Sequence, residues 1–101
     1  MMMRCPIHIA EDHPSFAGHF PGLPMLPGAI LLNEMLRAIA AARSIDLTQW
    51  QIASAKFLDV VRPGDGLLLE HDNTGAESIR FTIRDGTRTV ASGTLSSAPP
   101  D

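Results

Sequence analysis

The segment from residue 11 to residue 28 constrains this 101-residue chain more than any other part of it. Prolines stand at positions 14, 21, 24 and 27, and glycines at positions 18, 22 and 28. Proline fixes φ and lacks a backbone donor, and glycine permits positive φ, so neither a helix nor a central strand fits this density. We therefore expect a long shaped loop, and ordered loops of this length in small domains are usually functional.

An apolar segment follows the loop and predicts a helix from about Pro27 to Arg43. Pro27 suits the first turn of a helix because its missing N–H would have no partner there. The polar side chains form only a narrow stripe, and a helix that is apolar on nearly all sides is a buried one. The stripe consists of Asn33, Glu34, Arg37 and Ser44.

The remaining chain predicts strands joined by tight turns, which makes neighbouring strands antiparallel. We expect strands near residues 5–10, 51–58, 67–72, 79–84 and 87–95, with turns at 62–65, 73–75 and Asp85-Gly86. The predicted fold is an α+β domain spanning residues 1–101, in which a central helix (about 27–43) is covered by an antiparallel sheet of about five strands. Residues 96–101 are expected to form a disordered tail.

Composition and charge exclude several classes of function. The net charge is −3 and no face reads as a basic patch, so a nucleic-acid partner is not expected. The longest apolar stretch is too short and too polar to cross a bilayer, and the single cysteine, Cys5, fits a reducing cytoplasm. Neither metal-ligand spacing nor a phosphate-binding loop is present, so we expect no metal and no cofactor. His8 and His71 fall in predicted strands and are interpreted as surface residues.

His19, inside the loop, is the residue best suited to proton transfer, because an imidazole titrates near neutrality. The first N–H groups of the helix, those of Gly28, Ala29 and Ile30, have no partner within the helix and lie at the positive end of its dipole. Such donors can hold a carbonyl oxygen that gains negative charge. A base beside such donors suits abstraction of a proton next to a carbonyl, although a purely structural role for His19 remains an alternative.

The segment GHFPGLPMLPGAILLNE (18–34) resembles the signature of the β-hydroxyacyl-acyl-carrier-protein dehydratases, roughly GHFPxxPxxPGxxxxE/D. Phe16, the segment KFLDVVRPGD (56–65) and the final strand pair FTIRDGTRTVASGTL are similar to that family as well. The resemblance covers about residues 7–95. It implies the hot-dog fold, usually a dimer, and removal of water from a 3-hydroxyacyl thioester in fatty acid, polyketide or related lipid or pigment synthesis.

The resemblance also implies a site. His19 would take the α-proton, and the Gly28 N–H would polarise the thioester carbonyl. Phe16, Pro27 and Ala29 would complete the substrate-binding residues. An acyl carrier protein would be the partner, and the histidine and the acid of each site would come from different subunits.

The chain departs from the family signature at the acid. The family places its acidic residue fourteen positions after the histidine, which is Asn33 here, and Glu34 follows one position later. One step along a helix rotates a side chain by about 100°, so Glu34 does not simply replace that acid. An amide holds a hydroxyl by hydrogen bonds but does not donate a proton as an acid does. Glu34 also has a structural alternative, which is to pair with Arg37 or to complement the positive helix N-terminus.

Three functions remain open at this stage. The first is a dehydratase acting alone, by default as a homodimer, with Asn33 orienting the leaving hydroxyl. The second is a catalytically incomplete subunit that supplies His19 to a heterodimer with a paralogue. The third is a thioesterase or a non-catalytic binder of acyl thioesters.

Overall fold

The computed structural model describes residues 2–9, 28–62 and 65–97. These residues form one helix and five strands that make a single sheet in the order β1-β3-β4-β5-β2, and every neighbouring pair is antiparallel. The elements in chain order are β1 (Met3–His8), α1 (Gly28–Arg43), β2 (Gln51–Phe57), β3 (Gly66–Gly75), β4 (Ser78–Asp85) and β5 (Arg88–Ser96).

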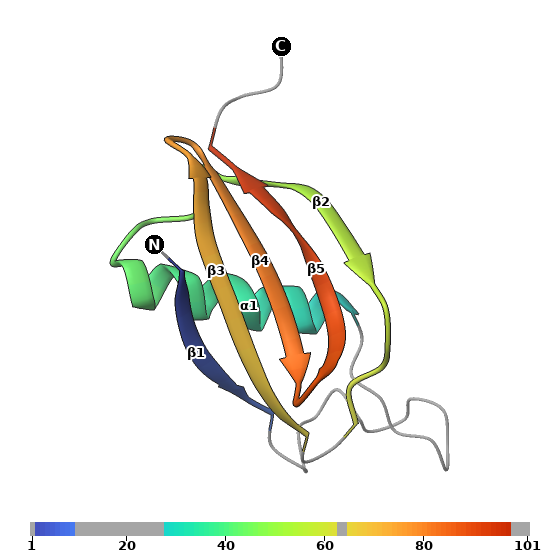
Figure 1. The fold of residues 1–101 in the computed structure, drawn as a ribbon. Helices are drawn as coiled ribbons and strands as arrows, with labels where there is room; N and C mark the ends of the chain where they lie inside the picture. Colours follow the sequence, from blue (N-terminus) through green and yellow to red (C-terminus); the bar gives the residue numbers. More distant parts are fainter. Residues whose placement is uncertain (1, 10–27, 63–64, 98–101) are drawn as a thin grey trace.

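The helix crosses one face of the sheet, beginning on the side of β5 and β2 and ending on the side of β1 and β3 (Figure 1). This arrangement of one central helix and a five-stranded antiparallel sheet confirms the predicted α+β hot-dog fold. No helix among the described residues is long and apolar enough to cross a membrane.

Three predicted boundaries need correction. The first strand covers Met3–His8 rather than residues 5–10. The turn expected at 73–75 lies at residues 76–77, because β3 continues to Gly75 before the chain reverses. The last strand includes Ser96, and the Ser97 N–H donates to the Glu77 carbonyl, so these two residues belong to the sheet rather than to a tail.

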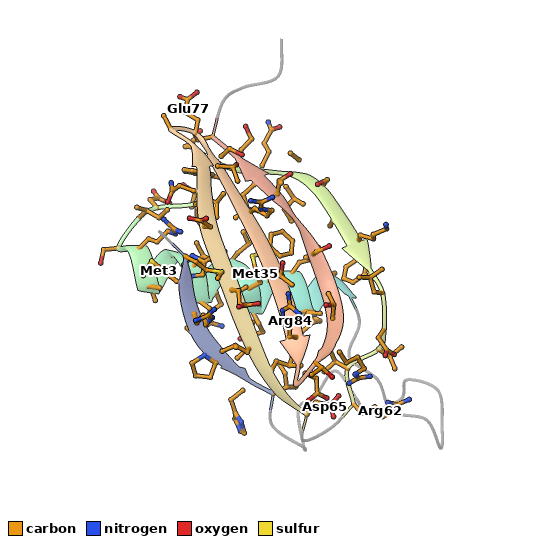
Figure 2. The ribbon with its side chains drawn as sticks, in the orientation of Figure 1. Met3, Met35, Arg62, Asp65, Glu77 and Arg84 are labelled. Atoms are coloured by element: carbon orange, nitrogen blue, oxygen red, sulfur yellow. The ribbon has the colours of Figure 1, made fainter. Side chains whose placement is uncertain are left out.

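The core lies between the helix and the inner face of the sheet. One stripe of α1, formed by Leu31, Met35 and Ile39, is buried. Met35 lies on the helix behind the central strands (Figure 2). The cross-strand register places inner side chains in rows across the sheet, and one such row is Cys5, Leu69, Ile83, Ala91 and Phe57.

The end of the helix is closed by a Schellman arrangement. Ser44 follows the last helical residue with φ of 53°, and the Ile45 N–H donates to the Ala40 carbonyl at 3.1 Å. Glycine usually occupies such a left-handed position, and serine here carries the steric cost of a Cβ.

The two outer strands of the sheet differ in proline content and in exposure. β1 contains Pro6, which lacks a backbone donor and is tolerated because β1 is an edge strand. β2 contains no proline, and all seven of its residues are exposed. An edge strand of that kind presents a row of backbone groups to any further strand.

Gly93 allows β2 to approach the rest of the sheet. A Cβ at this position would lie 2.1 Å from the Ser54 carbonyl oxygen and 2.8 Å from Cζ of Phe81. Because Gly93 has no side chain, the Phe81 ring and the backbone of β2 can both lie close to β5 at this position.

We expect Gly93→Ala to lower the free energy of unfolding by at least about 2 kcal/mol, because an overpacked core must shift backbone and side chains together. Gly66→Ala is the matched control, since a Cβ there meets no atom within 4 Å. Urea denaturation of both variants checks the prediction. Equal stabilities of the two variants would show that β2 can move away from β5 without cost.

Candidate functional site

The structure places four of the predicted site residues on one helix. Gly28 and Ala29 begin α1, and Asn33 and Glu34 lie on its second turn. The positions predicted for His19, Phe16 and Pro27 lie outside the described residues. The geometry of the candidate site is therefore the geometry of the helix start and of the strands packed around it.

The first turn of α1 is built to attract negative charge. It contains no acidic side chain, and the N–H groups of Gly28, Ala29 and Ile30 have no partner within the helix. Ala29 is exposed and Gly28 is half-buried. Backbone donors at such a terminus can bind a carbonyl oxygen as negative charge develops on it.

Phe57, the last residue of β2, packs against Gly28. A Cβ built on Gly28 would lie 2.7 Å from Cζ of the Phe57 ring, and 3.0 and 3.2 Å from Cε1 and Cε2. The far edge of the ring therefore touches the start of the helix, and glycine is required there for this contact. The strand predicted at 51–58 contained Phe57. The inward register of Phe57 was the signal that would have placed this residue beside the helix.

Asn33 lies on a different face of the helix from Gly28. Five residues separate it from Gly28, which corresponds to about 140° around the helix and about 7.5 Å along it. Gly28 shares the sheet-facing stripe of Leu31 and Met35, whereas the Asn33 side chain is exposed. Asn33 and the Gly28 N–H of one chain thus do not converge on the same small group.

Glu34 lies on a third face of the helix. It is half-buried and lines a groove of about 290 Å³ between α1 and β1, together with Pro6, His8 and Arg37. The groove places its carboxyl beside the strand at the opposite edge of the sheet from β2. Neither Asn33 nor Glu34 therefore reaches the donors at the helix start within the same chain.

His71 was predicted to be a surface residue, and this prediction is wrong. Its side chain is 1% exposed. The alternation of Leu67, Leu69 and His71 puts it on the inner face of β3, and that alternation was the signal missed. At the C-terminal end of α1, the Arg43 Nε donates to His71 Nδ1 at 2.9 Å, and Arg43 Nη1 donates to Asn73 Oδ1.

The environment of His71 favours its neutral form. Burial lowers the pKa of His71 below its ordinary value of 6.5, and the nearby Arg43 charge lowers it further. A neutral ring is also what the geometry requires, because Nδ1 accepts a hydrogen bond from a cation and must be unprotonated. His71 is thus a structural partner of Arg43, at the end of the helix remote from Gly28.

Acid is expected to destabilise the fold through His71. Between its folded and unfolded pKa values the unfolded chain binds the extra proton, so the free energy of unfolding falls as pH drops below about 6.5. The slope should be shallower in His71→Gln and unchanged in His8→Gln, since His8 is exposed. Urea denaturation between pH 5 and pH 8 measures it. An identical slope in His71→Gln would exclude His71 as the source.

The loop that follows Phe57 is held to β5. The N–H groups of Leu58 and Asp59 both donate to the Val90 carbonyl, at 2.8 and 3.2 Å. Arg88 Nη1 pairs with Asp59 at 2.9 Å. The pKa of Asp59 is lowered by the hydrogen bond from the Val60 N–H and then by Arg88. These contacts fix the backbone on the C-terminal side of the Phe57 ring.

Among residues 2–9, 28–62 and 65–97, no three His, Cys, Asp or Glu side chains gather in a way that could hold a metal ion.

Comparison with protein families places the whole fold in one group. A family described as "ApeI-like: ApeI dehydratase" matches residues 2–94. The 3-hydroxyacyl-[acyl-carrier-protein] dehydratase FabZ of Lactobacillus helveticus is 31% identical and is matched over 96% of this chain and 73% of its own length. The FabZ of Aliarcobacter butzleri is 39% identical over 59% of this chain. In that match the chain spans about half of the relative, 49%.

Solved structures agree with the fold. A chain of the dehydratase heterocomplex ApeI:P from Xenorhabdus doucetiae has a TM-score of 0.74 at 22% identity, over 94% of this chain and 85% of that one. The dehydratase domain of PpsC from Mycobacterium tuberculosis has a TM-score of 0.76 at 21% identity, over 99% of this chain and 40% of that one. The fluoroacetyl-CoA thioesterase FlK has a TM-score of 0.69 at 12% identity, over 94% and 82%. At these identities the likeness shows the fold alone.

Proposed function

Because the chain belongs to the ApeI-like family of hot-dog dehydratases, we propose that it removes water from a 3-hydroxyacyl thioester held on an acyl carrier protein. The product is the 2-enoyl thioester, in fatty acid, polyketide or related lipid or pigment synthesis. The observation that carries the proposal is the first turn of α1. That turn contains no acidic side chain, and its backbone donors begin at the Gly28 of the dehydratase-like motif. The proposed compartment is the cytoplasm.

In this reaction the Gly28 N–H donates to the thioester carbonyl oxygen, which acidifies the proton on C2. His19 takes that proton, the C2–C3 double bond forms, and the C3–O bond breaks. The hydroxide that leaves C3 accepts from His19 the proton taken from C2 and departs as water, which returns His19 to its neutral form. Asn33 orients the hydroxyl by hydrogen bonding. Glu34, the next residue on the same helix, is the candidate carboxyl group. No metal or cofactor enters these steps.

Two chains build each site in this proposal. Asn33 lies about 140° around the helix from Gly28, so the two residues serve the same substrate only when they come from different chains. The exposed edge of β2 is the surface that we assign to the second chain, by edge-to-edge pairing. A homodimer then contains two equivalent sites, each with Gly28 of one protomer and Asn33 of its partner.

A heterodimer with a paralogue is the second candidate. The observation that favours it is the likeness to a chain of the ApeI:P heterocomplex, a dehydratase of two different subunits by its description. In that arrangement the present chain supplies His19 and the Gly28 donor, and the paralogue supplies the acid. A thioesterase reaction remains a third outcome of the assay below, because FlK shares the fold.

We expect the purified protein to convert a 3-hydroxyacyl-carrier-protein to the 2-enoyl product. His19→Ala should lower kcat by at least about 100-fold, because a general base is lost. Absorbance of the enoyl thioester together with mass spectrometry of the carrier protein provides the measurement. His8→Ala is the matched control, since His8 is exposed on β1.

Asn33→Asp separates the candidates. Activity in the unmodified chain supports the lone enzyme, and an inactive chain restored by Asn33→Asp supports the incomplete subunit. Release of free carrier-protein thiol without enoyl product identifies a thioesterase. Activity that is indifferent to His19→Ala would contradict the assignment of that histidine as the base.

We expect the chain to sediment as a dimer of about twice its 10.9 kDa mass. Ile52→Glu on β2 should shift the protein to monomers, because it puts a charge on the proposed interface. Leu68→Glu is the control, since Leu68 is similarly exposed, 37% against 39% for Ile52, but lies on β3. Sedimentation equilibrium measures the mass. A monomer in the unmodified protein would refute a site built from two copies.

A further inference from the structure

We infer that Phe57 forms one wall of the acyl-thioester site and makes the chain select substrates with an unbranched C2 carbon. This inference rests on the proposed function, because it uses the Gly28 N–H as the donor to the thioester carbonyl. It adds a specificity residue from β2 to a site otherwise assigned to the loop and the helix.

The first observation is the incomplete burial of Phe57. It ends the inner row that runs through Leu69, Ile83 and Ala91, which are at most 1% exposed. Phe57 itself is 49% exposed. Only the far edge of its ring is used against Gly28, so a large part of the aromatic surface is left open beside the helix start.

The second observation is where the ring touches the helix. In an α-helix each Cα–Cβ bond tilts toward the N-terminus. A ring that occupies the Cβ position of Gly28 therefore lies toward the N-terminal end of the helix, where the N–H groups that have no partner within the helix point. The positive edge of an aromatic ring is also compatible with an oxygen that gains negative charge. A carbonyl bound to the Gly28 N–H consequently lies beside Phe57.

The third observation is that the backbone that carries the ring is held on both sides of Phe57. Its own residue is paired with Ala91 in the ladder, and Leu58 and Asp59 are bonded to the Val90 carbonyl. The Arg88–Asp59 ion pair holds the following loop. The wall is thus attached to the sheet on both sides of Phe57.

The consequence is a narrow space at C2. A carbonyl oxygen bonded to the Gly28 N–H lies about 3 Å from that nitrogen, and C2 is attached to the carbonyl carbon. A methyl branch on C2 replaces a hydrogen with a bulkier group next to a ring that is already in contact with the helix. Hydrophobic pockets discriminate one methyl group by about 10–200-fold, so a discrimination of this size is expected here.

The test compares pantetheine thioesters of 3-hydroxyoctanoic acid and of both C2 epimers of its 2-methyl derivative. We expect the unmodified protein to prefer the unbranched substrate by at least about 10-fold in kcat/KM. Phe57→Ala should reduce this preference at least about 10-fold by raising kcat/KM for the branched substrate, and Phe57→Leu should fall between them. Leu58→Ala is the matched control, because Leu58 is adjacent and 52% exposed.

The possible outcomes distinguish a failure of the inference from a failure of the proposed function on which it rests. Dehydration with an unchanged preference in Phe57→Ala overturns the inference and leaves the proposed function standing. Absence of dehydration in the unmodified protein overturns the function. The preference is then measured as equilibrium binding of octanoyl and 2-methyloctanoyl pantetheine. Equal binding of the two by the unmodified protein, or a preference that survives in Phe57→Ala, overturns the inference as well.

A double substitution tests the contact itself. Gly28→Ala should destabilise the protein, since its Cβ would lie 2.7 Å from the ring, and Phe57→Ala should remove most of that cost. Additive effects of the two substitutions on urea denaturation would show that the ring does not occupy the space beside Gly28, and would overturn the inference at its first step.

Discussion

The packing of one helical stripe against the inner face of the sheet is the constraint on which every other feature depends. Leu31, Met35 and Ile39 are the helical side chains that are buried, and the buried side chains of β1, β3, β4 and β5 are arranged around them. Because the helix crosses the strands, its two ends lie over opposite edges of the sheet (Figure 1). The beginning of the helix is thereby brought to β2, and its end to β3.

The two ends of the helix lie in different environments. At the start, Gly28 meets an aromatic ring, and the first turn contains no acidic side chain. At the end, Arg43 is tied to a buried neutral histidine and to Asn73. The first arrangement leaves donors for a ligand, whereas the second uses its donors to fasten the helix to the sheet. This division agrees with a site at one end and an anchor at the other.

Periodicity predicted most of this architecture. The apolar run after Pro27 predicted the helix, and strict alternation around Phe81 predicted a half-buried strand. The motif residues predicted the family. Pattern alone did not predict the burial of His71, because a polar residue in a strand is read as exposed unless its register is followed from Leu67 and Leu69. Nor did it predict the contact of Phe57 with Gly28, which depends on strand order and on the crossing of the helix, and neither is encoded locally.

Pro6 has a consequence for growth of the sheet beyond one molecule. A sheet with two available edges can recruit copies indefinitely and become a fibre. Pro6 lacks one of the backbone N–H donors that an incoming strand would bind at the β1 edge. β2 contains no proline and therefore lacks no such donor. Of the two sheet edges that the described residues form, only the β2 edge is free of proline, so growth of the sheet by strand pairing is disfavoured at β1.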